Sequence, residues 1–262
     1  MQQSLSKCRR HAHPDSDAPA GDGMERMIRR FPFLILALLF CLDTPGAEAQ
    51  VVRSGPSACK AIALTFDLCP VRNGRGYDEP LIKTLIEHRI PATFFMSGRW
   101  IDRHEAEVRE LQAVPFFEIG THGQVHAHLP MLDTTEQRAE ITDTVHLLKT
   151  KYGIEASLFR PPYGEFNDVT VEVVRALGLR FILWDRISGD PDPKLSREQI
   201  TGRLTAQARN GNIIVLHANG KGAHTKDVVE DLYREVIVAR GFRPVTVTQL
   251  LGQCQGEPPH AR

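Results

Sequence analysis

The sequence predicts an α/β fold built on a parallel sheet, because short β-rich apolar runs alternate with helical patterns about seven times. The connections between these segments are short, and no low-complexity linker or internal repeat interrupts the chain after residue 50. We therefore expect a single domain, whose sheet is either closed into a barrel or doubly wound. The predicted strands are residues 61–66, 92–96, 116–120, 157–159, 181–184, 212–216 and 244–247.

Two of the helical patterns carry clear end signals. Asp133 is placed to cap a helix that runs to Lys151, with Glu136 at the third helical position and Gly153 as the stop. The second helix is predicted over residues 167–177. Apolar side chains recur at helical spacing in both segments, so each helix has one face that packs on the sheet.

The charge balance argues against a highly charged partner. Lys plus Arg and Asp plus Glu each number 32, which leaves a formal net charge of zero. Proteins that bind nucleic acid or an anionic membrane surface usually carry an excess of basic residues. We therefore expect no nucleic-acid partner and favour a neutral one.

The N-terminal region has the pattern of an exported protein. Residues 24–49 are predicted to be a signal peptide, because arginines precede the apolar run 31–42 and Ala47-Glu48-Ala49 follows it. The apolar run is too short to cross a ~30 Å bilayer core as a helix, so no stable membrane span is expected. Residues 1–23 are expected to be a disordered upstream extension and residues 50–262 the catalytic domain. The predicted location is periplasmic or extracellular.

Cleavage after residue 49 would leave three cysteines, Cys59, Cys69 and Cys254. In an oxidising compartment, an odd number implies at least one unpaired thiol or an intermolecular bond. Cys59 precedes the first predicted strand and Cys254 lies near the chain end, so we hypothesise a disulfide between these two. Three reduced thiols are the alternative.

Polar residues with catalytic potential follow the predicted strands one after another. Functional groups of parallel α/β folds collect at the carboxyl ends of the strands. His122 and His126 have the i, i+4 spacing that lets two imidazoles reach one divalent cation. The other segments at strand ends are Asp67, Arg160–Gly164, Trp184–Asp190 and His217.

Each of these residues also has a purely structural interpretation. Asp67 can cap the turn that follows it, Arg160 can form a salt bridge in a rigid turn, and His217 can be a buried residue at a strand end. His128 and His224 are interpreted as surface or supporting residues.

Taken together, the segments resemble the polysaccharide deacetylases, which form carbohydrate esterase family 4 and contain the NodB homology domain. The similarity extends from about Ala61 to Leu251 and includes all five family motifs in order. Its clearest motifs are Thr65-Phe66-Asp67-Leu68-Cys69-Pro70, Thr121-His122-Gly123-Gln124-Val125-His126, Arg160-Pro161-Pro162-Tyr163-Gly164 and Ile214-Val215-Leu216-His217. The resemblance implies a distorted (β/α)7 barrel of parallel strands. It also implies a hydrolase that removes N-acetyl or O-acetyl groups from acetylated sugars or cell-wall polysaccharide.

The resemblance further implies roles for individual residues. Asp67 would be the general base that activates the attacking water, and His217 would protonate the leaving amine. Arg160, supported by an acid such as Asp190, would hold and tune Asp67. The backbone N–H of Tyr163 would stabilise the oxyanion.

The metal site departs from the family pattern. The resemblance implies an Asp-His-His set that binds a divalent cation, most simply zinc, with His122 and His126 as two ligands. Leu68 stands where the metal-binding aspartate is expected and cannot coordinate. Four outcomes remain: extra water ligands, Asp67 as a ligand or near-ligand, Cys69 as a thiolate ligand, or no metal. Among these, the sequence favours Asp67.

Because of this altered metal site, and because Pro191 replaces an expected tryptophan, two other functions stay open. In the first, the same barrel carries a hydrolase of another small amide or ester. Alternatively, the chain is a non-catalytic glycan-binding protein with a degenerate metal site. The joint presence of Asp67, Arg160 and His217 favours an enzyme, since a binding module needs no general base.

Overall fold

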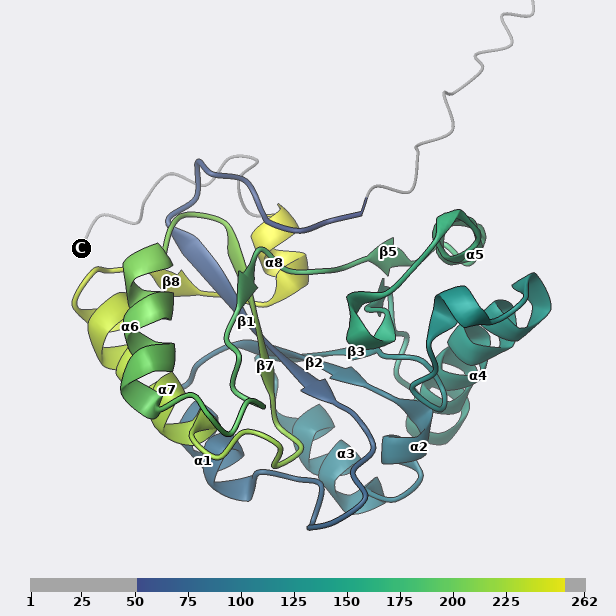
Figure 1. Ribbon diagram of the computed structural model, residues 1–262, viewed down its shortest axis with the longest axis horizontal. Helices are drawn as coiled ribbons and strands as arrows, with labels where there is room; N and C mark the ends of the chain where they lie inside the picture. The colour runs from purple at the N-terminus through teal and green to yellow at the C-terminus, as the bar shows by residue number, and fades with distance from the viewer. Residues whose placement is uncertain (1–50, 253–262) are drawn as a thin grey trace, which may run out of the picture. The chain divides into compact units, whose positions relative to one another are not determined.

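A curled parallel sheet forms the centre of the structure, a computed structural model that describes residues 51–252 (Figure 1). Its strand order is β5-β4-β3-β2-β1-β7-β6, and β8 also pairs with β1. The seven strands along this path are parallel and form an incomplete barrel, in which β1 lies between β2 and β7. This arrangement confirms the predicted fold class. The strands are β1 Ala61–Leu68, β2 Ala92–Met96, β3 Phe117–Thr121, β4 Leu158–Phe159, β5 Arg180–Phe181, β6 Arg186–Ile187, β7 Asn212–His217 and β8 Arg243–Pro244.

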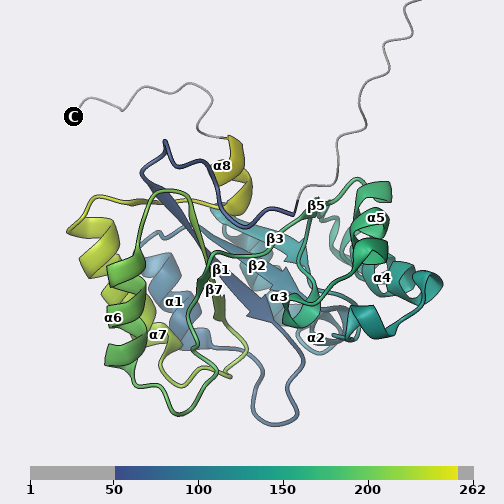
Figure 2. The ribbon, with the colours of Figure 1, turned by 45° about the horizontal axis from the view of Figure 1, so that its top comes forward.

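Helices surround the outside of this sheet (Figures 1 and 2). Two of them begin and end close to the positions that their capping signals predict. In α4, Asp133 and Glu136 form a capping box, and Gly153 ends the helix in the left-handed conformation; Asn167 caps α5 in the same way. The helical segments are α1 Glu79–Glu87, α2 Gly98–Ile101, α3 Glu105–Ala113, η1 Leu129–Met131, α4 Thr134–Tyr152, η2 Pro162–Gly164, α5 Asp168–Ala176, α6 Arg197–Gln207, α7 Thr225–Leu232, η3 Tyr233–Val238 and α8 Val247–Gly252.

Two strand regions of the structure, β6 and β8, differ from the prediction. Strand β6 was not predicted, because a two-residue strand that contains Arg186 has no periodic apolar signal. At the other end, the predicted strand 244–247 is wrong over most of its length. Thr246 and Gln249 exchange hydrogen bonds in a capping-box pattern that starts α8 at Val247, and this overrides the β propensity of the valines.

Strand β1 is buried on both faces. Ile62, Leu64, Phe66 and Leu68 belong to the core that includes apolar side chains of the surrounding helices. Ala61 and Ala63 belong to a second cluster with Phe95 of β2 and Ile213 of β7. Because successive side chains of a strand point to opposite faces, Asp67 lies on the same side as Ala63, inside the barrel.

The sheet path ends at β5 on one side and at β6 on the other. The segment before β1 lies against the open β5 edge. Val52 donates a backbone hydrogen bond to Phe181 and accepts one from Leu183, at 2.9 and 2.7 Å. Farther along, the backbone N–H of Gly55 donates to the carbonyl oxygen of Gly211 at 2.8 Å.

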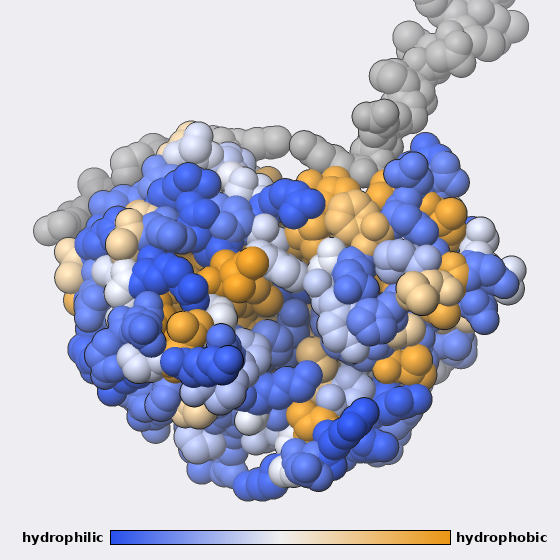
Figure 3. Space-filling model, in the orientation of Figure 1, coloured by the Kyte–Doolittle hydropathy of each residue, from blue (hydrophilic) through white to orange (hydrophobic). Residues whose placement is uncertain are grey.

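The surface on the face shown in Figure 3 is mainly hydrophilic, with hydrophobic side chains in separate patches. None of the helices within residues 51–252 is long and apolar enough to cross a membrane. The predicted extension 1–23 and signal peptide 24–49 lie outside the described residues.

The cysteines fall into two classes. Cys59 is disulfide-bonded. Cys254 lies outside the described residues, so the Cys59–Cys254 pairing stays a prediction. Cys69 is a free thiol and is buried.

Candidate functional site

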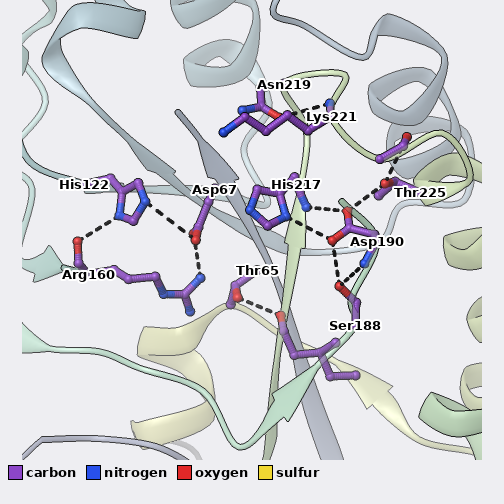
Figure 4. Close-up of polar contacts among 12 residues, drawn as sticks. Thr65, Asp67, His122, Arg160, Ser188, Asp190, His217, Asn219, Lys221 and Thr225 are labelled. Carbon is purple, nitrogen blue, oxygen red and sulfur yellow. Dashed lines mark hydrogen bonds and ion pairs between the residues drawn. The ribbon is translucent and has the colours of Figure 1, made fainter. Parts of the chain in front are cut away.

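The predicted site residues meet at the carboxyl end of the sheet. Strands β1 and β7 pair in a register that sets Asp67 beside His217, and Figure 4 shows Asp67 between His122 and His217. A pocket of about 240 Å³ opens here. Its lining includes Asp67, Cys69, His122, His126, Tyr163, Trp184, Asp190, His217 and Lys221.

Arg160 holds one oxygen of the Asp67 carboxylate. Its Nη1 atom donates to Asp67 Oδ1 at 2.8 Å, and its Nη2 atom donates to the carbonyl oxygen of Leu183 at 3.2 Å. The guanidinium is fully buried and lies over the Phe95 ring, 4.0 Å from its centroid. Burial alone raises the pKa of Asp67, but the charge and hydrogen bond of Arg160, together with the neighbouring His122 and His217, outweigh this effect, so the pKa is lowered overall. Asp67 is therefore ionised at neutral pH.

Asp190 lies in a different place from the one expected. It was predicted to support Arg160, but it contacts His217 instead. Asp190 Oδ1 lies 3.0 Å from His217 Nδ1, and Oδ2 accepts from the His217 backbone N–H at 2.9 Å. The reason is topological: Asp190 follows β6, which neighbours β7, whereas Arg160 follows β4 on the other side of β1. Ser188 and Thr225 donate the remaining hydrogen bonds to Asp190, both at 2.7 Å.

This contact changes the acidity of His217. Burial lowers the pKa of His217, but the hydrogen bond and the charge of Asp190 outweigh this effect, so the pKa is raised. Because Nδ1 faces Asp190, Nε2 is left to exchange a proton in the pocket. The site thus pairs an ionised carboxylate at the end of β1 with a histidine at the end of β7, whose protonated form is stabilised by Asp190 after β6.

The two histidines of the predicted metal site follow β3. His122 Nδ1 donates to the carbonyl oxygen of Arg160 at 2.9 Å, since a carbonyl can only accept, and this leaves the Nε2 lone pair free. His122 Nε2 lies 3.7 Å from Asp67 Oδ2, and the two histidine rings are 4.9 Å apart between centroids. Burial lowers the pKa of both, that of His126 to about 3. Both imidazoles are therefore neutral, as metal ligands must be.

Glu140 of α4 holds the loop that carries His126, and sequence reasoning missed this residue. Its Oε1 atom accepts from the backbone N–H groups of Val125 and Ala127, at 2.9 and 3.0 Å. The signal for it was a carboxylate next to Ile141 on the face of the predicted helix that packs on the sheet, where Glu140 is indeed buried. Gly123 fits the same arrangement, because its φ is +74° and a Cβ there would lie 3.0 Å from Glu140 Oε1. His126 itself has a φ of +66°, a strained value for a residue with a side chain.

Tyr163 lines the pocket from η2, and the residue is 53% exposed. Its φ of +60° is again unusual for a residue other than glycine. The ring stacks on His128, with centroids 4.1 Å apart, and His128 also contacts Glu165 at 2.7 Å. His128 thus supports Tyr163 from the surface, as its interpretation from sequence suggested. His224 occupies the N-cap position of α7.

The donor atoms at this end of the sheet fit a divalent cation. Within residues 51–252, Cys69 Sγ and one nitrogen each of His122 and His126 lie within 4.8 Å of one another. Asp67, the ligand favoured from sequence, falls outside this group. Two neutral imidazoles and a sulfur donor suit zinc better than magnesium or calcium, which prefer oxygen.

Comparison with known proteins agrees with these motifs. The family model described as Polysaccharide deacetylase matches residues 54–182. A peptidoglycan-N-acetylglucosamine deacetylase of Bacillus cereus is 29% identical over 201 residues, which cover 75% of this chain and 90% of that protein.

The chain belongs to the polysaccharide deacetylase family. Other relatives of this family member differ in size and activity. A bifunctional xylanase/deacetylase of Pseudobutyrivibrio xylanivorans is 25% identical over 80% of this chain, which spans about a third (35%) of that protein's length. The crystal structure of a pseudoenzyme of the same family from Bacillus anthracis superposes with a TM-score of 0.69. That match has 22% identity and covers 76% of this chain and 68% of the other, so it supports the fold alone.

Proposed function

We propose that this family member is an exported, metal-dependent hydrolase that removes N-acetyl groups from sugars of a cell-wall glycan. The observation that carries the proposal is the pairing of Asp67 with His217 across β1 and β7. Each has its own partner, Arg160 for Asp67 and Asp190 for His217, and these partners stabilise opposite protonation states. A carboxylate kept ionised and an imidazole whose protonated form is favoured are the base and the acid that amide hydrolysis needs.

In the proposed reaction, Asp67 takes a proton from the water molecule that attacks the acetyl carbonyl carbon. As the C–N bond breaks, His217 Nε2 gives its proton to the leaving amine, so that the products are acetate and a free amino sugar. Arg160 keeps Asp67 in place through the 2.8 Å contact to Oδ1. We assign the stabilisation of the oxyanion to the backbone N–H of Tyr163, at the mouth of the pocket.

We assign His122 and His126 as ligands of the cation, and zinc suits these donors best. When bound, such a cation polarises the carbonyl oxygen and lowers the pKa of water. Their neutral state and the fixed orientation of His122 support this assignment.

Two relatives support the substrate class. The Bacillus cereus protein acts on peptidoglycan N-acetylglucosamine, and a Bacillus subtilis protein 29% identical over 73% of this chain is named as a peptidoglycan-N-acetylmuramic acid deacetylase. Peptidoglycan lies outside the cytoplasm, which agrees with the signal peptide predicted over residues 24–49.

The test is acetate release from N-acetylated oligosaccharides and peptidoglycan fragments, with simple amides and aryl acetates assayed in parallel. Loss of a general acid or base costs about 10²–10⁴-fold in rate, so we expect this loss in Asp67→Asn and in His217→Gln. Thr142→Ala on the outer surface of α4 is a matched control and should keep full activity.

Each alternative function predicts another result. Turnover of aryl acetates or small amides without turnover of acetylated sugars would assign the barrel to a different substrate. Glycan binding that both substitutions leave intact, with no hydrolysis by the unmodified protein, would make the chain a binding protein.

A further inference from the structure

We propose that the third protein ligand of the cation is Cys69, so that the ligand normally supplied by residue 68 has moved one position along the chain. The inference rests on the proposed function, because it concerns the metal of the same site. It replaces an oxygen donor by sulfur and produces a His₂Cys site.

The direction of the side chains on β1 explains why residue 68 does not contribute. Leu68 is completely buried and belongs to the core that packs against the helices, together with Phe66. Asp67 points to the other face of the strand, into the pocket. Because side chains alternate along an extended chain, residue 69 returns to the face of Asp67. Cys69 lines the pocket accordingly, whereas a carboxylate at position 68 would have to leave the hydrophobic core.

The three donor atoms already have nearly the spacing of a metal site. They lie within 4.8 Å of one another. Ligands at about 2.0–2.3 Å from a tetrahedral zinc are separated by about 3.3–3.8 Å, so a movement of roughly 1 Å completes the site. The neighbouring backbone is fixed, because Asn219 Nδ2 donates to the carbonyl oxygen of Cys69 at 3.1 Å. Cys69 is 3% exposed and His122 is 1% exposed, so bulk water does not compete for either donor.

The arrangement leaves Asp67 free for its catalytic role. Asp67 Oδ1 is held by Arg160, and Asp67 is not part of the group of three donor atoms. Catalytic zinc sites typically have three protein ligands and one open position. With Cys69 as the third ligand, the protein supplies this number without using the general base. A thiolate also favours zinc over the harder manganese and magnesium ions.

The decisive experiment is the absorption spectrum of the purified full-length protein titrated with Co²⁺, a spectroscopic substitute for zinc. Thiolate coordination gives an intense near-ultraviolet band from charge transfer between sulfur and cobalt, which nitrogen and oxygen ligands do not produce. We expect this band to saturate at one Co²⁺ per chain. It should be lost in Cys69→Ser, while Leu68→Ala, a neighbouring change on the opposite face, should keep it. Circular dichroism checks that each variant folds.

Zinc affinity, measured by competition with a chelator, provides a second measurement. In Cys69→Ser it should fall by at least about a hundredfold, the upper end of the loss caused by removing the outer partners of metal ligands. A Co²⁺ complex of the unmodified protein without the sulfur band, or with a band that persists in Cys69→Ser, would overturn the assignment, as would the absence of any bound cation.

Acetate release from the same protein preparations separates this inference from the proposed function. Hydrolysis that depends on added metal but lacks the sulfur band would refute Cys69 as a ligand and leave the deacetylase proposal standing. A sulfur band lost in Cys69→Ser, combined with no hydrolysis of any acetylated sugar, would establish the metal site and refute the deacetylase function.

Discussion

At the scale of single residues, Asp190 determines the protonation of the proposed acid. It accepts hydrogen bonds from both the ring and the backbone of His217, and Ser188 and Thr225 hold it in position. Without a negative charge at this position, burial would lower the pKa of His217. The Asp190 carboxylate therefore raises the pKa of His217 above the usual value of a histidine, so that the ring keeps its proton to higher pH.

Replacement of Asp190 by Asn should shift the pH dependence of catalysis. Activity requires protonated His217, so kcat/KM falls as pH rises through the pKa of that residue in the free enzyme. In Asp190→Asn, that pKa drops and the alkaline limb of the kcat/KM profile should move to lower pH. The exposed Asp192→Asn on the same loop serves as the control and should leave the limb in place. An unchanged limb in Asp190→Asn would remove His217 from the role of acid.

The buried pair of Asp67 and Arg160 should show strong coupling in stability. Breaking a buried ion pair leaves one charge uncompensated and typically costs about 3–5 kcal/mol. We expect a loss of about 3 kcal/mol in the free energy of unfolding for Arg160→Met and a smaller loss when Asp67→Asn is added. Urea denaturation of both single variants and the double variant measures the coupling. Additive losses would show that the two side chains act independently.

At the scale of an element, the loop after β3 depends on α4 for its shape. Glu140 binds two backbone N–H groups of this loop, and Gly123 supplies a conformation and a close approach that other residues tolerate poorly. The loop in turn sets the position of His126. Helix α4 therefore supports the proposed metal site, although none of its residues lines the pocket.

Glu140→Ala should destabilise the protein and weaken metal binding together. It leaves the two part-buried backbone donors of Val125 and Ala127 without their partner, and an unsatisfied donor costs up to about 1–3 kcal/mol when it is buried. We expect a loss of about 3 kcal/mol in urea denaturation and a weaker affinity for zinc. Glu140→Gln keeps an acceptor oxygen at the same place and should lose much less. Equal effects of the two substitutions would mean that the oxygen does not hold the loop.

At the scale of the whole molecule, the incomplete barrel depends on the chain before its first strand. Val52 bridges Phe181 and Leu183 next to β5, and Gly55 binds Gly211 just before β7. These contacts join residues that are more than a hundred positions apart in sequence. The Val52 contacts also cover backbone groups at the β5 edge, which the sheet path leaves open.

Val52→Pro tests this contribution. Proline removes the N–H that donates to Phe181, and we expect a loss of about 1–2 kcal/mol in the free energy of unfolding beyond that of Val52→Ala, which removes only side-chain packing. The two variants are compared by urea denaturation. Equal stability of the proline and alanine variants would show that the backbone bridge contributes nothing.

Much of this molecule follows from local sequence signals. The strands that position Asp67 and His217 are apolar runs of eight and six residues, and helices α4 and α5 have capping residues whose hydrogen bonds are local. The β6 strand was beyond prediction, because it consists of two residues paired across the sheet. The start of α8 was missed because the valines around it favour a strand, although Thr246 and Gln249 have the spacing of a capping box. The same distinction applies to the site: its residues were identified, but not all of their partners.

The sequence by itself determined the parallel α/β fold and the set of side chains at its carboxyl edge, because periodicity and strand-end position are properties of neighbouring residues. Only the tertiary structure decided that Asp190 contacts His217 rather than Arg160, since this depends on which strands lie side by side. The tertiary structure also decided that Leu68 is buried in the core while Cys69 lies beside the two histidines. Which face of a strand becomes the pocket is set by the curvature and packing of the whole sheet.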